Sequence, residues 1–524
     1  MKRGKHIKMR RRVAVVAFCV VGLSVSAFWH PAVAAINPPV RTDADRNATP
    51  LRVDMRRIGP LRQKDVREVG DSNWTIDGAP VDRDFAEFDK YCNYLPALGV
   101  RKIRVLTGWA KSERVRGKID VVWLDRIVDW CAAHGMEPLL ELSYGNPIYP
   151  GAGGAGLADG IPNTEEGLAA WDRWVEFLAV HFKGRVREWA MWNEPDMRLK
   201  DNTPEMIAAF NVRSAKILRR HMPDCRLHAL SLANNDPKLL EDCIRPMGGD
   251  AKLFDTFIYH GYVGNPDFSY PTVERSKKVL AKYAPHAKLR QGENGAPSEF
   301  LDRFALSNWP WSETSQAKFD MRRALGDLGH DVESGLFCIV DINYRPPTFP
   351  LFFCNRKGYL RINPSNDVIQ VKRAFYAMQN VAGLFNHDLR RVAARGISTT
   401  DRTLALFEYR TGGGLPLFVF WDRGPVTMKG FDFNAVKSAE QIEECVELDR
   451  NAVPGDSFET RERVFEWTGT PLKEPVWVDL MTGWAYAVPP DRQIVHAAGT
   501  TFVRIPAYDS PCVLTERRAL DLQD

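Results

Sequence analysis

The stretch EWAMWNEP, residues 188–195, carries the clearest fold signal in this chain of 524 residues. Its apolar and aromatic side chains predict a buried strand over Val186–Trp192. The strand is followed at once by a carboxylate, Glu194, and by Pro195. A helix is then expected over Pro204–Arg220, with proline at its first turn. The unit is therefore a strand, an acidic residue at the strand's C-terminal end, and a helix.

The same alternation extends in both directions, from about residue 60 to residue 387. Further strands are predicted over Lys102–Leu106, Pro138–Leu142, Arg226–Ser231, Phe257–Tyr262, Lys288–Gly292 and Gly335–Val340, and helices over Val121–His134, Glu165–Phe182, Pro237–Arg245, Val273–Tyr283 and Thr314–Leu328. Val368–Phe385 closes the series, and Val66–Val69 is taken as its first strand, which makes eight. Such repeats form an open doubly wound sheet or a closed barrel, and eight strands favour a TIM (β/α)8 barrel over residues 60–387.

The pattern changes after about residue 388. Short segments alternate with period two between Gly, Pro and Asp turns, at Thr403–Tyr409, Leu417–Phe420, Pro475–Leu480 and Thr501–Ile505. This texture predicts a β-sandwich domain over residues 388–524. Within residues 35–59, the segment Leu51–Ile58 is expected to add an edge strand to it.

The N-terminus resembles an export signal. A basic stretch over residues 2–12 precedes an apolar run over Val13–Phe28, and Ala32-Val33-Ala34 fits a signal peptidase site. A signal peptide over residues 1–34 and export to a periplasm or the extracellular space are expected. A retained anchor is the alternative, although the apolar run is short for a membrane span.

Charge and cysteine usage exclude several classes of partner. Seven of the 71 Lys and Arg lie in residues 1–12, so the remaining chain has 64 basic against 66 acidic residues. No nucleic-acid partner is expected, and no membrane partner once the signal is removed. The eight cysteines outside residues 1–34 are scattered without a C-x-x-C motif, which argues against a zinc site. Neither a metal nor an organic cofactor is expected. A disulfide between Cys445 and Cys512 is left open.

Residues 151–156, GAGGAG, match G-x-G-x-x-G literally. A dinucleotide-binding fingerprint needs a strand directly before the glycines and a helix that opens from them. Pro147 and Pro150 precede these glycines and Pro162 follows them. We therefore interpret the segment as a loop after the third strand.

Two carboxylates end strands that lie opposite each other in the predicted barrel. Glu194 ends the fourth strand and Glu293, in RQGENG, ends the seventh. TIM barrels place their chemistry at the C-terminal ends of the strands. Hydrolysis of a glycosidic bond needs one acid for the leaving oxygen and a second carboxylate for the anomeric carbon, about 5 Å apart in enzymes that retain configuration.

At this point the sequence resembles a known group of enzymes. Trp192-Asn193-Glu194-Pro195 is similar to the acid/base motif of glycoside hydrolase clan A, the TIM-barrel retaining glycosidases. The resemblance implies that Glu194 is the acid/base and Glu293 the nucleophile. It also implies that Asn193 binds the sugar 2-hydroxyl.

Other segments extend the resemblance. His260-Gly261-Tyr262 is similar to the clan's His-x-Tyr, whose tyrosine contacts the nucleophile, and Arg104 matches an arginine beneath the nucleophile. Glu141-Leu142-Ser143 and the tail segments 478–483 and 505–511 are closest to family 39. The chain lacks the clan's tryptophan at the end of strand eight, and Tyr144-Gly145-Asn146 lacks the histidine that many members carry.

Aromatic residues in the expected strand-end loops are candidate platforms for sugar faces: Trp109, Tyr144, Trp309, Trp311 and Tyr344. Together these features predict an exported retaining glycoside hydrolase that acts on a β-linked oligo- or polysaccharide. An inactive carbohydrate-binding barrel and a transglycosidase with the same two glutamates are the alternatives. The sugar, exo or endo action and the oligomeric state are left open.

Overall fold

The computed structural model describes residues 48–157, 159–346, 351–386, 388–393, 396–424, 426–428, 446–468, 470–496 and 499–523. The predicted signal peptide over residues 1–34 and Cys445 lie outside these ranges. Within them, the structure contains no helix whose length and hydropathy would let it cross a membrane.

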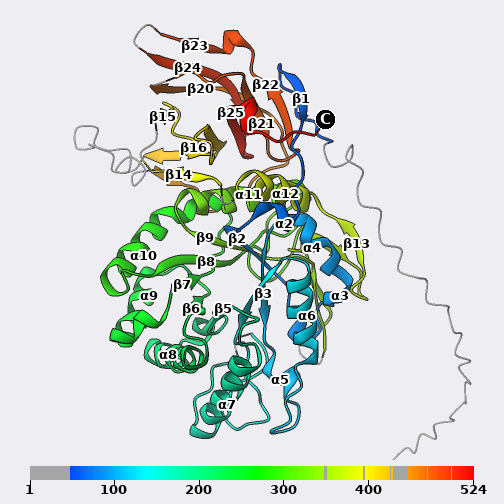
Figure 1. Cartoon of the computed structure of the whole chain (residues 1–524), viewed down its shortest axis with the longest axis vertical. Coiled ribbons are helices and arrows are strands. Elements are labelled where there is room, and N and C mark those ends of the chain that lie inside the picture. The colour runs from blue at the N-terminus through cyan, green and yellow to red at the C-terminus, as the bar shows by residue number, and fades with distance from the viewer. Residues whose placement is uncertain are drawn as a thin grey trace, which may run out of the picture. The chain divides into compact units, whose positions relative to one another are not determined.

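A closed barrel of eight parallel strands forms the first and larger part of the described chain (Figure 1). The strands follow one another around the barrel in chain order: β2 (Trp74–Asp77), β3 (Lys102–Leu106), β4 (Glu137–Glu141), β5 (Glu188–Ala190), β6 (Arg226–Leu232), β7 (Thr256–Tyr259), β8 (Lys288–Asn294) and β9 (Glu333–Leu336). Parallel barrel strands are buried on both faces, and every residue of β2 and β3 is buried. The predicted TIM barrel is confirmed.

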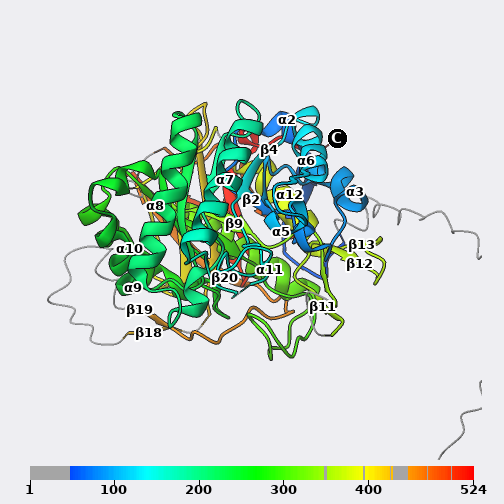
Figure 2. The same ribbon diagram turned by 90° about the horizontal axis from the view of Figure 1, so that it is seen from below.

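Helices surround the strands on the outside of the barrel (Figures 1 and 2). They are α2 (Val66–Val69), α3 (Phe88–Tyr91), α4 (Leu95–Leu98), α5 (Trp109–Ser112), α6 (Val122–Ala133), α7 (Glu165–His181), α8 (Pro204–His221), α9 (Pro237–Ile244), α10 (Tyr270–Tyr283), α11 (Glu313–Gly329) and α12 (Arg373–Leu384). Local sequence sets their starts. Thr164 and Thr203 cap α7 and α8 by accepting hydrogen bonds from backbone N–H groups of the first turn.

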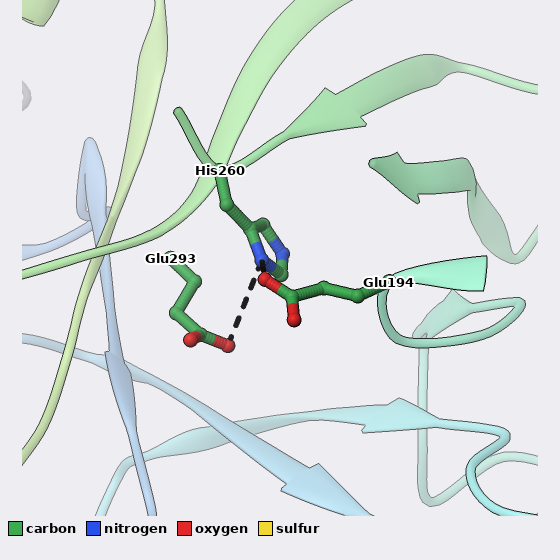
Figure 3. A group of neighbouring side chains, drawn as sticks. All are labelled: Glu194, His260 and Glu293. Atoms are coloured by element: carbon green, nitrogen blue, oxygen red, sulfur yellow. Dashed lines mark hydrogen bonds and ion pairs between the residues drawn. The ribbon is translucent and has the colours of Figure 1, made fainter. Parts of the chain in front are cut away.

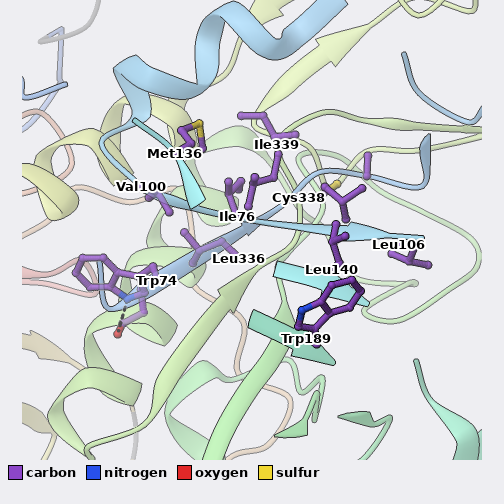
Figure 4. Packing of buried hydrophobic residues seen from close by; sticks show 14 of the residues in the cluster. Trp74, Ile76, Val100, Leu106, Met136, Leu140, Trp189, Leu336, Cys338 and Ile339 are labelled. Atoms are coloured by element: carbon purple, nitrogen blue, oxygen red, sulfur yellow. Dashed lines mark hydrogen bonds between the residues drawn. The ribbon is translucent and has the colours of Figure 1, made fainter. Parts of the chain in front are cut away.

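A large apolar core lies between the barrel strands and the helices around them, where Trp189 packs on Phe182. Ile76 of β2, Leu140 of β4, Trp189 of β5 and Leu336 of β9 belong to one cluster of buried apolar side chains (Figure 4). Alternate strand positions face the other way, into the barrel, where Leu139, Ala190 and Ile258 form a small separate apolar cluster.

The prediction for the first strand was wrong. Val66–Val69 forms the short helix α2, and the first barrel strand is β2, Trp74–Asp77. Asp65 and Glu68 form a capping box. The Asp65 side chain accepts a hydrogen bond from the N–H of Arg67, and the Glu68 side chain accepts one from the N–H of Asp65. This local device outweighs the strand preference of two valines. The polar residues Thr75 and Asp77 interrupt the apolar pattern of β2, so the sequence did not indicate a strand there.

Several other strands are shorter than predicted. β5 ends at Ala190, β7 at Tyr259 and β9 at Leu336. The residues expected at the ends of these strands therefore lie in the loops that follow them.

The C-terminal part contains two antiparallel sheets. The seven-stranded sheet has the order β1-β22-β21-β25-β17-β16-β14 and comprises β1 (Arg56–Pro60), β14 (Arg390–Val392), β16 (Leu404–Arg410), β17 (Pro416–Asp422), β21 (Pro475–Asp479), β22 (Trp484–Ala487) and β25 (Cys512–Glu516). The four-stranded sheet has the order β15-β20-β24-β23 and comprises β15 (Ile397–Ser398), β20 (Arg461–Thr468), β23 (Gln493–Val495) and β24 (Thr500–Ala507). Buried side chains from both sheets, including Phe420 and Val503, share one apolar cluster, as expected of a sandwich.

Three two-stranded pairs complete the described structure. They are β10 (Ile342–Tyr344) with β11 (Phe353–Asn355), β12 (Leu360–Ile362) with β13 (Val368–Val371), and β18 (Val426–Met428) with β19 (Val446–Leu448). The first two pairs lie in the connection between β9 and α12. They supply residues to the candidate site described below.

Candidate active site

Charged side chains gather at the C-terminal end of the barrel strands. Asp77 ends β2, Glu141 ends β4 and Glu293 is the last residue but one of β8. Glu194 follows β5, and His260 follows β7 directly. Both predicted carboxylates thus lie at the end of the barrel where TIM barrels carry their chemistry.

Glu194, His260 and Glu293 form a compact group (Figure 3). Nδ1 of His260 lies 2.8 Å from Oε1 of Glu194 and 3.8 Å from Oε2 of Glu293. One oxygen of each carboxylate and one ring nitrogen all lie within 4.8 Å of one another. The two carboxylates therefore face a common space from opposite sides of the barrel.

The backbone fixes Glu194 in an uncommon conformation. Its φ of 49° and ψ of 54° lie in the left-handed region, which costs a non-glycine residue of order 1 kcal/mol or more. The Glu194 N–H donates to the carbonyl oxygen of Ser231 at 2.9 Å, and Pro195 starts the short 3-10 turn Pro195–Arg198. This turn directs the carboxylate toward the barrel axis instead of along the chain.

Arg104 connects the carboxylates at the base of the group. Its Nη1 donates to Oε2 of Glu293 at 2.8 Å and to Oδ2 of Asp77 at 2.6 Å, and its Nε donates to Glu141. Its Nη2 donates to Oδ1 of Asn193 at 2.6 Å. One buried cation thus orients three carboxylates and an amide, because a guanidinium presents five donors in a fixed plane.

Two further contacts fix the amide and the nucleophile candidate. Asn193 Nδ2 donates to the hydroxyl of Tyr144 at 2.6 Å, which defines the orientation of the amide. The hydroxyl of Tyr262 donates to Oε1 of Glu293 at 3.0 Å. The geometry brings together the predicted residues Arg104, Tyr144, Asn193 and Tyr262 with the two glutamates.

The surroundings shift the pKa values of the two carboxyls in opposite directions. Burial and the charge of Glu293 raise the pKa of Glu194 above its usual range, although His260 opposes this shift. Burial also acts on Glu293, but the charges of His260 and Arg104 and the hydrogen bonds from Arg104 and Tyr262 outweigh it and lower the pKa of Glu293. Such a divergence is how two like groups take the roles of acid and base.

His260 is the group that both carboxylates share. Burial disfavours its charged form, but the charge of Glu293 and the hydrogen bond to Glu194 prevail and raise its pKa. Its main chain is held as well, since Nε2 of Gln291 and Nδ2 of Asn294 both donate to its carbonyl oxygen.

The donor set is a poor match for a divalent cation. Glu194, His260 and Glu293 form the one cluster of three possible metal ligands found among the described residues. The guanidinium of Arg104 already contacts Glu293 at 2.8 Å and would repel a cation there. The group is therefore better suited to proton transfer and nucleophilic attack than to metal binding.

Four of the five predicted aromatic platforms separate into two groups, while the fifth, Tyr144, is buried with its hydroxyl on Asn193. Tyr344 is half-buried and stacks on Phe304, with ring centroids 4.8 Å apart. Trp309 is half-buried and packs, as Tyr262 does, against a small apolar cluster. Both keep a partly exposed ring near the end of the barrel, and their role as platforms stays a prediction.

The structure encloses Trp109 and Trp311, which argues against a platform role for either ring. Trp109 is fully buried in α5, where its Nε1 donates to Glu113 at 2.6 Å and its ring stacks on Trp174. Trp311 is buried as well, and its Nε1 donates to the carbonyl oxygen of Leu306 at 2.8 Å. Neither ring has a face open to a ligand.

Residues 151–156 lie in a long connection, since β4 ends at Glu141 and α7 begins at Glu165. A Cβ on Gly151 would come within 2.2 Å of the Thr164 side chain, so this glycine serves close packing. The interpretation as a loop is confirmed.

Three residues near the site were missed from the sequence. Asp77 was overlooked because β2 was not recognised, although an acid at the end of a strand is a usable signal. Arg83 follows β2, and its guanidinium carbon lies 4.9 Å from the ring centroid of Tyr144. Lys357 comes from the connection after β9, far along the chain, and no sequence pattern marks it.

Comparison with known proteins supports the fold. No protein-family model and no curated protein sequence matches the chain. Among solved structures, a family 39 glycoside hydrolase from the gut symbiont Bacteroides cellulosilyticus WH2 is similar with a TM-score of 0.58 and 16% identity, over 87% of this chain and 83% of that one.

Two further structures agree with this likeness. The GH39 enzyme from Xanthomonas axonopodis pv. citri has a TM-score of 0.51 and 16% identity, over 88% of this chain and 97% of that one. A GH30 endoxylanase from Clostridium papyrosolvens C71 has a TM-score of 0.51 and 11% identity, over 88% and 98%. The structural neighbours of this chain are therefore clan A glycoside hydrolases of families 39 and 30, as the motifs indicated.

Proposed function

We propose that this protein is a retaining glycoside hydrolase in which Glu293 is the nucleophile and Glu194 the acid/base. One observation carries the proposal: two half-buried carboxylates with opposite pKa shifts have oxygens within 4.8 Å of each other. Retaining enzymes hold their carboxyl groups about 5–5.5 Å apart, whereas inverting enzymes need about 6.5–9.5 Å to admit a water. The short spacing favours double displacement.

In the first step, the ionised Glu293 attacks the anomeric carbon while Glu194 gives its proton to the departing glycosidic oxygen. The C–O bond to the leaving group breaks and an ester to Glu293 forms. In the second step, Glu194 takes a proton from water, the water oxygen attacks the anomeric carbon, and the ester breaks. Arg104 and Tyr262, which both donate to Glu293, hold its oxygens during attack.

We also propose that the substrate is a β-linked oligo- or polysaccharide. The GH30 structural neighbour described above is an endoxylanase, which acts on a polysaccharide. Asn193, held by Arg104 and Tyr144, is placed beside both carboxylates, where its amide can bind a hydroxyl next to the anomeric carbon.

The test is hydrolysis of a panel of aryl β-glycosides by the wild type and by Glu293→Ala and Glu194→Ala. The Glu293 variant should lose nearly all turnover. The Glu194 variant should regain turnover with azide when the leaving group is activated, since it then needs no acid. Glu165→Ala, which removes an exposed carboxylate from the first turn of α7, is the matched control.

Undiminished hydrolysis by a folded Glu293→Ala protein would contradict the assignment. Product analysis at high substrate concentration separates hydrolysis from transglycosylation. Binding of glycans without any turnover, on aryl glycosides and polysaccharides alike, would instead favour an inactive carbohydrate-binding barrel.

We propose export as well, on the pattern of residues 1–34 alone. The basic stretch, the apolar run and Ala32-Val33-Ala34 support cleavage after Ala34. N-terminal sequencing of the protein from its source would test this. A mature chain that still begins with the basic stretch would contradict cleavage.

A further inference from the structure

A buried lysine lies behind the candidate nucleophile. Lys357 is 1% exposed, and its ammonium donates to the carbonyl oxygen of Gly295 at 2.7 Å. The same ammonium lies 4.8 Å from the ring centroid of Tyr262. Among the described residues, no carboxylate forms an ion pair with it. A buried cation without an ion-pair partner is costly, so its position calls for an explanation.

The protein builds a rigid support for this lysine. Asp341, fully buried after β9, accepts hydrogen bonds from Lys372 at 2.6 Å and from the N–H of Gly358 at 3.0 Å. A Cβ on Gly358 would lie 2.0 Å from the backbone nitrogen of Asp341, so the turn packs directly against the end of the strand. Lys357 is thereby fixed by its own main chain and not only by its ammonium.

Both groups that the ammonium contacts, the carbonyl of Gly295 and the ring of Tyr262, are connected to Glu293. Gly295 follows Glu293 by two residues, and a Cβ on it would lie 1.9 Å from the carbonyl oxygen of Phe337, so this segment has no room to shift. Tyr262 donates its hydroxyl proton to Oε1 of Glu293. A cation over the face of a phenol ring attracts its π electrons and makes the hydroxyl a stronger donor.

We propose that Lys357 is a positioning residue for Glu293, which acts through the carbonyl of Gly295 and through the ring of Tyr262. This inference rests on the proposed function, because it gives the lysine a part in holding the nucleophile. Lys357 does not itself reach the reacting atoms. Its charge favours the ionised form of Glu293, and its two contacts hold the end of β8 and Tyr262 in the orientation that the carboxylate needs.

The electrostatic surroundings are consistent with this role. Burial lowers the pKa of Lys357 to about 7, while the acidic groups of Asp320 in α11, Cys338 and Glu293 act in the opposite direction. Tyr262 faces the ammonium from the loop after β7. The pKa of Glu293 is lowered from its usual value, so Lys357 carries its charge in the acidic range where Glu293 ionises.

The experiment compares Lys357→Met and Lys357→Arg with the wild type. The control is Lys318→Met, which replaces another buried lysine that pairs instead with Asp509. The first readout needs no turnover. With tyrosine labelled with 13C at Cζ, the resonance of Tyr262, assigned from Tyr262→Phe, follows the ionisation of Glu293 through their hydrogen bond.

Removing the charge should raise the pH midpoint of that resonance in Lys357→Met by about half a unit or more. The midpoint should stay near the wild-type value in Lys357→Arg and in Lys318→Met. With glycoside substrates, Lys357→Met should lower kcat about ten- to hundredfold, since a displaced catalytic group costs up to about 10²-fold. KM should change little, because the lysine does not contact the sugar.

An unchanged midpoint in Lys357→Met, or a kcat equal to that of Lys318→Met, would overturn the inference. A shifted midpoint in a protein whose wild type hydrolyses no glycoside would have another meaning. It would contradict the proposed function and leave the role of Lys357 at Glu293 supported.

Discussion

Nη1 of Arg104 lies 2.8 Å from Oε2 of Glu293 and within 2.6 Å of Asp77, so one buried guanidinium connects β2, β3 and β8. These contacts also lower the pKa of Glu293. Arg104 is therefore part of both the fold and the electrostatics of the candidate nucleophile.

Replacing Arg104 by Met should lower the stability of the fold and raise the pKa of Glu293. Asp77, Glu141 and Glu293 would lose their cation, and breaking a buried pair in this way typically costs about 3–5 kcal/mol of unfolding free energy. The pKa of Glu293 should rise, so the acid limb of the kcat/KM profile should move to higher pH. Urea unfolding and pH–rate profiles measure the two effects. Arg104→Lys keeps a charge but loses the planar set of donors, so its stability and its acid limb should lie between those of the wild type and Arg104→Met. An acid limb that stays in place in Arg104→Met would contradict the electrostatic role.

The basic limb of the pH–rate profile should belong to Glu194. Burial and the charge of Glu293 raise the pKa of Glu194, so it is protonated in the pH range where Glu293 is already ionised. Activity needs that proton and should fall as pH rises through the pKa of Glu194. With an activated leaving group, Glu194→Gln should lose this fall in the glycosylation step. If the basic limb persists unchanged in that variant, another group supplies the proton.

Replacing Trp109 should change the free energy of unfolding, whereas replacing Tyr344 should change KM. Trp109→Phe leaves a buried Glu113 oxygen without its donor, which should cost about 1–3 kcal/mol of unfolding free energy with KM unchanged. Tyr344→Ala should raise KM about two- to tenfold, the range expected from aromatic stacking of about 0.5–1.5 kcal/mol. Thermal unfolding and steady-state kinetics on the same glycoside measure both. A raised KM in Trp109→Phe would show that the burial of this ring misrepresents its role.

Much of this arrangement could be predicted from the sequence, for identifiable reasons. Glu194 follows an apolar and aromatic segment and Glu293 is flanked by glycines near the end of β8, and the barrel topology places both positions at one end. Arg104 lies inside a strand whose apolar neighbours make it conspicuous. Asp77 was missed because its strand is short and half polar, and because Val66 and Val69 of the helix α2 suggested a strand in the wrong place.

The remaining residues could not be found because their signals are tertiary. Lys357 reaches the site from a connection whose course depends on the buried Asp341–Lys372 pair. Trp109 begins the short helix α5 and Tyr344 ends the short strand β10, and only packing decides that one ring is enclosed and the other is partly open. Sequence periodicity reports which face of an element is buried, but not which loop residue folds back into the core.

The opposite end of the barrel should determine acid stability. His228 is fully buried in β6, and its Nε2 lies 3.1 Å from Oε2 of Glu188 at the start of β5. Burial lowers the pKa of His228 to about 4, whereas the unfolded chain titrates near 6.5. Between these values the unfolded state binds more protons, so the free energy of unfolding should fall as pH decreases from about 6.5 to 4, by roughly 3 kcal/mol.

The variant His228→Gln keeps a polar side chain in β6 but has no group that titrates in this window. Its unfolding free energy should therefore depend less on pH between about 6.5 and 4 than that of the wild type. Urea unfolding at several pH values measures the slope, with His496→Gln, at an exposed histidine, as the control. The hydrogen bond from His228 and the nearby cations also lower the pKa of Glu188. Protonation of Glu188 therefore lowers the free energy of unfolding further at still lower pH. The variant keeps the cations, so it should show part of this second loss. Equal slopes for the wild type and His228→Gln would mean that His228 is already charged in the folded barrel, held so by Glu188.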